Sequence, residues 1–142
     1  MPSRVTALPY RYTPSGVLEV LLVKSRRRGR WILPKGKLEA NEHGHERAAL
    51  EAREEGGVEG DISATPLFRS RIFDPSQPKI YPLLVTTELD VWPEMAVRER
   101  AWMTVPQAVR AVSGDRLQRV LDIFPSEITA HAAGPAHTVE AL

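Results

Sequence analysis

The stretch that decides the fold reads GKLEANEHGHERAALEAREEGGV and occupies residues 36–58. Asn41 is a suitable N-cap for a helix, and the early acidic residues suit the positive end of a helix dipole. Gly56 and Gly57 suit the C-terminal end, where a left-handed backbone is common. The pattern therefore predicts one helix that begins near Asn41 or Glu42 and ends at the two glycines.

Three glutamates lie on one side of this predicted helix. Glu54 and Glu55 follow Glu51 by three and four residues, so the three carboxylates project from neighbouring positions. Like charges at this spacing repel each other, and a divalent cation would reverse that cost because Mg²⁺ takes oxygen ligands. The spacing alone leaves a second interpretation open, which is a solvated acidic face without a ligand.

The flanking sequence alternates between strand-like and helix-like segments. Apolar runs bounded by turn residues predict strands over 5–12, 17–25, 31–33, 62–72, 80–89 and 99–103. Amphipathic spacing predicts two further helices over 105–112 and 116–124. This order predicts an α/β fold with a mixed sheet and helices on both of its sides. We expect a single domain over residues 1–124 and a frayed tail over 125–142.

The composition indicates one domain and excludes several chemistries. The chain has 142 residues, of which 42% are hydrophobic. No apolar run approaches the roughly 18 residues of a membrane span, and the first residues, MPSR, lack the apolar stretch of a secretory signal. Cysteine is absent, which excludes thiol catalysis, cysteine-ligated metals and disulfides. We therefore expect a cytoplasmic protein with no membrane partner.

The net charge of +1 conceals two segments of opposite sign. Residues 24–37 carry seven basic and no acidic side chains, whereas residues 39–61 carry eight acidic and two basic ones. Two interpretations remain: two solvated faces, or an acidic metal cluster beside a basic cradle for a polyanion. The run Arg26-Arg27-Arg28 is short and lacks interleaved aromatic residues, so nucleic acid is not the expected partner.

The deciding stretch resembles the Nudix box, the signature of the Nudix hydrolase family. The family pattern is Gly, five residues, Glu, seven residues, Arg-Glu-aliphatic, one residue, Glu-Glu, one residue, Gly, aliphatic. The matching residues are Gly36, Glu42, Glu51, Ala52, Glu54, Glu55, Gly57 and Val58. The resemblance implies a Nudix-type α/β/α sandwich around the mixed β-sheet.

One position departs from the box. Leu50 stands where the family has an arginine that helps to hold the glutamates in place. We expect either that Arg53 or Arg47 supplies this support, or that Leu50 is a core residue whose burial forbids a charge.

The flanks narrow the resemblance to one branch of the family. WILPKG from residue 31 and RERAWM from residue 98 are similar to segments of diphosphoinositol polyphosphate and dinucleoside polyphosphate hydrolases. This likeness implies Mg²⁺-dependent, or Mn²⁺-dependent, hydrolysis of a phosphoanhydride bond in nucleoside-diphosphate-linked or polyphosphorylated small molecules. A broad nucleoside-diphosphate hydrolase and a Nudix-fold binding module without catalysis remain as alternatives.

The resemblance also assigns residues. It implies Glu51, Glu54 and Glu55 as metal ligands and catalytic residues, with backbone carbonyls near Gly36 completing the shell. The candidates for binding substrate phosphates are Lys35, Arg69, Arg71, Arg98 and Arg100. Ordinary surface charge remains the alternative for each of these basic residues taken singly. The expected partner is a phosphorylated small molecule, and the protein is expected to be a monomer or a homodimer.

Overall fold

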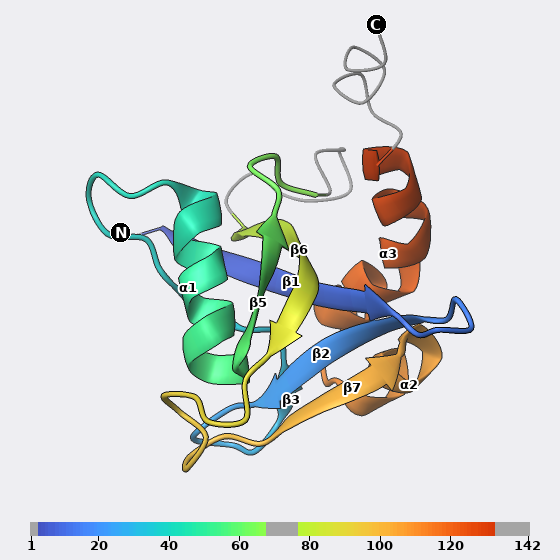
Figure 1. Cartoon of the computed structure of the whole chain (residues 1–142), viewed down its shortest axis with the longest axis horizontal. Helices are drawn as coiled ribbons and strands as arrows, with labels where there is room; N and C mark the ends of the chain where they lie inside the picture. Colours follow the sequence, from blue (N-terminus) through green and yellow to red (C-terminus); the bar gives the residue numbers. More distant parts are fainter. Residues whose placement is uncertain (1–2, 68–76, 133–142) are drawn as a thin grey trace, which may run out of the picture.

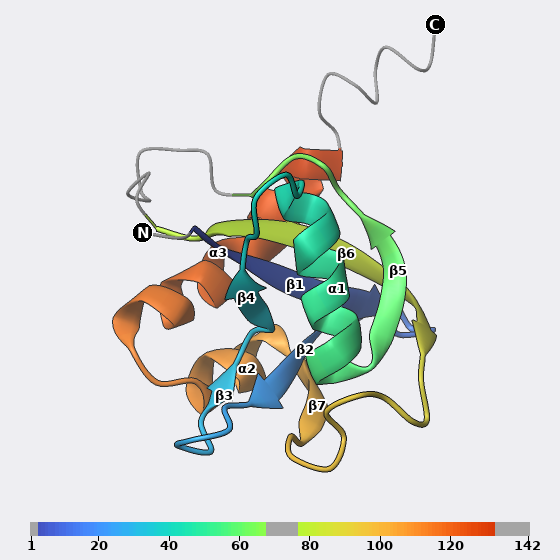
Figure 2. The same cartoon turned by 90° about the vertical axis from the view of Figure 1, so that its left-hand side faces the viewer.

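The computed structural model describes residues 3–67 and 77–132 (Figure 1). The elements are β1 (Arg4–Tyr12), β2 (Leu18–Lys24), β3 (Trp31–Ile32), β4 (Lys35–Lys37), α1 (Gly44–Gly56), β5 (Val58–Ile62), β6 (Lys79–Glu88), β7 (Arg100–Thr104), α2 (Val105–Ala111) and α3 (Asp115–Ala132). Figure 2 shows α1 covering one face of the sheet, with α2 and α3 behind it. The predicted α/β/α sandwich is confirmed.

Strand β1 organises the mixed sheet. It runs parallel to β6 and antiparallel to β2 and β4. The hydrogen-bonded path is β3-β2-β1-β6-β5, with β7 added to β2 and β4 added to β1. Because β1 is long, its first residues pair with β4, where Val5 lies opposite Gly36, and its last residues pair with β2. This split brings β4 into contact with α1, the helix of the acidic stretch.

Successive residues of β1 face different helices, as the pleat of a strand requires. Leu8 packs with Phe124 of α3 in one buried cluster, whereas Ala7 packs with Ala48 and Ala52 of α1 in the other. Both alanines are fully buried. Their small side chains let α1 lie close against the sheet, and this close packing fixes the depth at which the helix carries its glutamates.

Helix α1 begins later than its sequence predicts. The N-cap is His43, and its side chain makes no capping hydrogen bond. Asn41 has a φ of 67°, a left-handed conformation that asparagine tolerates better than most residues, so it turns the chain ahead of the helix. The prediction of Asn41 as N-cap is therefore wrong. The glycine end is confirmed, because Gly57 is left-handed and its N–H donates to the Arg53 carbonyl at 3.0 Å.

Two other boundaries differ from the predictions. The strand expected over 62–72 overlaps β5 only at Ile62, where β5 ends. The following described residues contribute one isolated bridge, from Leu67 to Ile80, and residues 68–72 lie outside the described part. The tail expected from Pro125 is helical as far as Ala132, because α3 continues through the proline. Ile128 is 4% exposed in the core, and this burial offsets the backbone hydrogen bond that proline removes. Across residues 3–67 and 77–132, no helix has both the length and the apolar character needed to cross a bilayer.

Candidate active site

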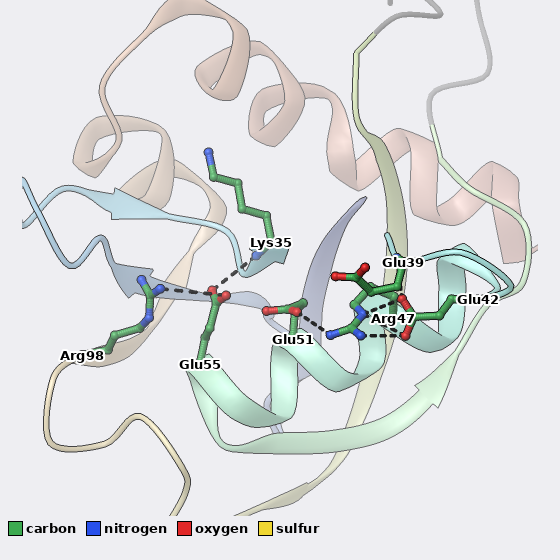
Figure 3. A network of polar contacts seen from close by, with 7 residues as sticks. All are labelled: Lys35, Glu39, Glu42, Arg47, Glu51, Glu55 and Arg98. Atoms are coloured by element: carbon green, nitrogen blue, oxygen red, sulfur yellow. Dashed lines mark hydrogen bonds and ion pairs between the residues drawn. The ribbon is translucent and has the colours of Figure 1, made fainter. Parts of the chain in front are cut away.

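Glu55 is the buried centre of a polar cluster on α1 (Figure 3). It is 4% exposed, an unusual burial for a carboxylate. Its Oε1 accepts a 3.3 Å hydrogen bond from the backbone N–H of Lys35, and its Oε2 lies 3.9 Å from a guanidinium nitrogen of Arg98. Three segments therefore meet at this carboxylate: α1, β4 and the loop before β7.

The neighbourhood of Glu55 favours its neutral form. Burial, together with hydrogen bonding and repulsion from the Glu51 carboxyl, raises the pKa of Glu55 to about 8, although Arg98 and the Lys35 N–H oppose this change. The raised pKa therefore favours the protonated form of Glu55. A proton relieves the conflict between two adjacent buried carboxylates, and a divalent cation in its place would relieve it as well.

Gly36 marks the closest approach of β4 to the acidic face of α1. A side chain at this position would collide with the carboxyl group of Glu51. Because glycine has no side chain, the Glu51 carboxylate can lie beside the β4 backbone, whose carbonyl oxygens suit a hard cation. Glu51, Glu55 and the backbone at Gly36 therefore fit an ion such as Mg²⁺ by the chemistry of their donor atoms.

Glu54, the third predicted metal ligand, does not join Glu51 and Glu55. Within the described ranges, no three His, Asp or Glu side chains converge in a way that could hold a metal. The structure brings Glu51 and Glu55 together and does not add Glu54. The role of Glu54 remains a prediction.

Arg47 connects two glutamates at the start of α1 (Figure 3). Its Nε lies 3.0 and 3.1 Å from the two carboxylate oxygens of Glu42, and a terminal nitrogen donates to the same carboxylate at 2.6 Å. The other terminal nitrogen donates to Glu51 at 3.1 Å. Arg53, the other candidate for this support, donates to Glu59 instead. Of the two arginines, Arg47 is the one that contacts the site.

Leu50 is a surface residue. Its side chain is 39% exposed, although the neighbouring turns of α1 bury Ala48 and Ala52. The alternative in which Leu50 is a core residue is therefore wrong.

A basic pocket opens beside Glu55. It has a volume of about 290 Å³, and among the described residues Glu55 is the one acidic residue in its lining. In the part of the chain that the structure describes, six basic residues line it: Arg4, Arg26, Arg27, Arg28, Lys35 and Arg98. The three consecutive arginines come from the loop between β2 and β3, so the basic strip of the sequence lies next to the acidic helix. Such a pocket attracts polyanions, because each cation adds to one positive field.

The sequence comparison decides the family. The family described as the NUDIX domain matches residues 3–122. The chain belongs to the Nudix family. Nudix hydrolase 12, mitochondrial, of Arabidopsis thaliana is 38% identical over an alignment of 118 residues that covers 75% of this chain and 58% of that protein. Nudix hydrolase 21, chloroplastic, of the same plant is 32% identical over an alignment of 130 residues that covers 84% of this chain and 64% of that protein.

One human Nudix relative is named for its substrate. Diphosphoinositol polyphosphate phosphohydrolase 3-alpha of Homo sapiens is 35% identical over an alignment of 98 residues that covers 66% of this chain and 60% of that protein. The chain thus spans about three fifths of the length of these three relatives.

Solved Nudix structures share the fold. A Caenorhabditis elegans Ap4A hydrolase in a binary complex has a TM-score of 0.64 and 15% identity, covering 91% of this chain and 98% of its own. The NUDIX domain of Shewanella oneidensis NrtR, complexed with ADP ribose, has a TM-score of 0.67 and 18% identity, covering 90% and 88%.

The remaining basic residues that the Nudix resemblance singled out divide into three groups. Lys35 and Arg98 line the pocket. Arg69 and Arg71 lie outside the described residues. Arg100 is occupied elsewhere: it donates to the carbonyls of Gly56 and Gly57 at 3.1 and 3.2 Å and stacks on the ring of Trp92. It therefore holds the C-terminal end of α1.

Several pocket residues escaped assignment from the sequence. Arg4 precedes the first predicted strand, and no local pattern connects it to the box. Arg26, Arg27 and Arg28 were visible as part of a basic strip, and the strip was the signal that a cradle lay near the acids.

Proposed function

We propose that this chain is a Mg²⁺-dependent hydrolase of phosphoanhydride bonds in highly phosphorylated small molecules. The observation that carries the proposal is the basic pocket, in which six described basic residues share the lining with the buried Glu55. One diphosphate needs fewer positive partners than this. The preferred substrates are therefore diphosphoinositol polyphosphates or dinucleoside polyphosphates. The human relative is named for the first of these classes, and the C. elegans neighbour is named for Ap4A, a member of the second.

The residues of the chain have separable tasks in this proposal. Glu51 and Glu55, with the backbone at Gly36 and Glu54 as a proposed third ligand, would hold Mg²⁺ or Mn²⁺. When bound, such a cation neutralises phosphate oxygens and lowers the pKa of a coordinated water. Lys35, Arg98 and the loop arginines bind and orient the remaining phosphates, and their positive charge stabilises the transition state.

A binding module that lacks catalysis is the alternative. Leu50 favours it, because the box has lost its usual arginine. The contacts of Arg47 with Glu42 and Glu51 argue against it, since they give these carboxylates a guanidinium partner although position 50 has none. ADP-ribose is the smaller substrate to compare, because it is bound to the NrtR domain.

A phosphate-release screen tests the proposal. Purified chain with Mg²⁺ is given a diphosphoinositol polyphosphate, a dinucleoside polyphosphate and ADP-ribose. We expect a higher kcat/KM for the first two, and a steeper loss with added salt, because screening weakens charge-driven capture. Glu55→Gln should lower turnover by at least about 100-fold. Glu59→Gln, an exposed glutamate paired with Arg53, is the matched control and should remain fully active.

Equal efficiency on all three compounds, with the same salt response, would reject the polyphosphate preference. Full activity of both Glu55→Gln and Glu51→Gln would reject the site itself.

We also propose a cytoplasmic location and a monomeric or homodimeric state. The cysteine-free composition supports a reducing compartment. The plant relatives are named for mitochondria and chloroplasts, so fractionation of the source cells should include organelles. Light scattering of the purified protein measures the oligomeric state.

A further inference from the structure

Arg47 makes more contacts with the acidic cluster than any single ion pair would supply. Three of its nitrogens are engaged, and they reach two carboxylates that face the guanidinium from different segments. Glu42 lies before the first residue of α1, whereas Glu51 lies within the helix. The Arg47 side chain is 18% exposed, and that of Glu51 is 13% exposed. Solvent screening is therefore weaker here than at an exposed surface pair.

The far end of this network is anchored to the backbone. Glu42 accepts a 2.7 Å hydrogen bond from the N–H of Glu39, in the loop that leads from β4 to α1. The near end is the Glu51 carboxylate, which fills the space left by Gly36. A continuous set of contacts thus runs from the loop through Glu42 and Arg47 to the carboxylate beside Glu55.

We propose that Arg47 is the positioning residue of this site and performs, one turn earlier on α1, the bracing for which position 50 of the Nudix box normally supplies an arginine. Arg47 fixes the Glu51 carboxylate against β4 and keeps it from moving away from Glu55. Leu50 is then free of that task, which agrees with its exposure on the helix surface. The inference concerns metal affinity and therefore rests on the proposed function.

Metal titration tests the positioning role of Arg47 without any substrate. The full chain is titrated with Mn²⁺ alone, and free Mn²⁺ is measured by electron paramagnetic resonance. Arg47→Ala should weaken Mn²⁺ affinity by about 10- to 100-fold, the usual cost of losing a partner that orients a ligand. Arg47→Lys should retain only part of the Mn²⁺ affinity. The lysine keeps the positive charge, but its single ammonium cannot contact both carboxylates as the guanidinium fork does. Arg53→Ala, which removes another arginine pair from the same helix, should leave the affinity unchanged.

Relocating the charge is the sharper test. The double variant Arg47→Ala/Leu50→Arg should recover much of the lost Mn²⁺ affinity, since it restores an arginine at the usual position. Recovery in the double variant, with no effect of Arg53→Ala, supports the proposal. Unchanged affinity in Arg47→Ala, or no recovery in the double variant, overturns it.

A metal-free measurement separates this inference from the proposed function. If the wild-type chain binds no Mn²⁺, the proposed function fails at its first step. The brace is then judged by thermal unfolding of Arg47→Ala, Glu51→Gln and their combination. Less-than-additive shifts of the unfolding temperature support a direct Arg47–Glu51 interaction, and additive shifts overturn it.

Discussion

The raised pKa of Glu55 predicts that metal binding strengthens steeply with pH. A metal ligand must lose its proton, so the apparent affinity for Mg²⁺ follows the ionised fraction of the carboxyl. With a pKa of about 8 in the metal-free chain, that fraction is about 1% at pH 6 and about one half at pH 8. The Mg²⁺ affinity should therefore rise by about 50-fold over these two pH units.

Calorimetric titration with Mg²⁺ measures this effect directly. Repeating the titration at pH 7 in buffers of different ionisation enthalpy counts the protons released, and we expect about one per bound ion. Glu55→Gln removes the titrating group, so its weak residual affinity should change little between pH 6 and pH 8. The exposed Glu59→Gln variant should keep the wild-type pH dependence.

The same carboxyl should affect stability with the opposite dependence on pH. Its pKa in the folded state lies above the value of about 4.3 expected in the unfolded chain. The folded form therefore carries an additional proton between these two values. The resulting stabilisation is complete below about pH 4 and is lost as the pH rises through about 8.

The unfolding temperature of the metal-free protein should accordingly fall between pH 5 and pH 8, and Mg²⁺ should restore it at pH 8. Equal Mg²⁺ affinity at pH 6 and pH 8, or a wild-type pH dependence in Glu55→Gln, would refute the reasoning.

Three further substitutions test other parts of the structure. Gly36→Ala should displace the Glu51 carboxylate and weaken Mg²⁺ affinity by at least about 10-fold with an almost unchanged unfolding temperature; wild-type affinity would show that the carboxylate has another position. Arg100→Ala should cost about 2 kcal/mol in urea unfolding, because it removes charged hydrogen bonds to the end of α1; an increased KM for polyphosphates without loss of stability would return Arg100 to the substrate site. Ile128→Ala should lower the free energy of unfolding by about 2 to 5 kcal/mol, because it is a buried large-to-small change. A loss below about 0.5 kcal/mol would mean that the part of α3 after Phe124 adds little to stability.

The helix of the acidic stretch was predictable because its information is local. The spacing of Glu51 and Glu55 places their side chains on one side of any helix, and the paired glycines end it. The start of that helix was not predictable, because asparagine at position 41 suits both an N-cap and a left-handed turn. The sequence pattern does not distinguish these uses, and the packing of Gly44 against Tyr81 contributes to where the helix begins.

Contacts between distant segments were the least predictable part of the site. The contact from Arg47 to Glu42 depends on how the loop before α1 folds back, and no periodicity contains that information. The contact from Arg47 to Glu51 is local by comparison, because the two residues lie four apart on α1, whereas Arg53 lies only two from Glu51 and does not face it. Arg100 is a second residue whose partner depends on contacts between distant segments. Its charge suggested a phosphate ligand, whereas the β7 register places it at the end of α1. The extension of α3 past Pro125 depends on the buried position of Ile128, which only tertiary packing defines.

The acidic and basic halves of the pocket come from independent pieces of chain. Glu55 belongs to a helix locked against the sheet by alanines, whereas three of the arginines belong to a single surface loop between β2 and β3. Exposed loops accept substitutions and insertions far more readily than packed helices do. Under the proposed function, a lineage carrying this scaffold can therefore change the compounds it recognises by altering one short connection, while the helix that would hold the metal is inherited intact.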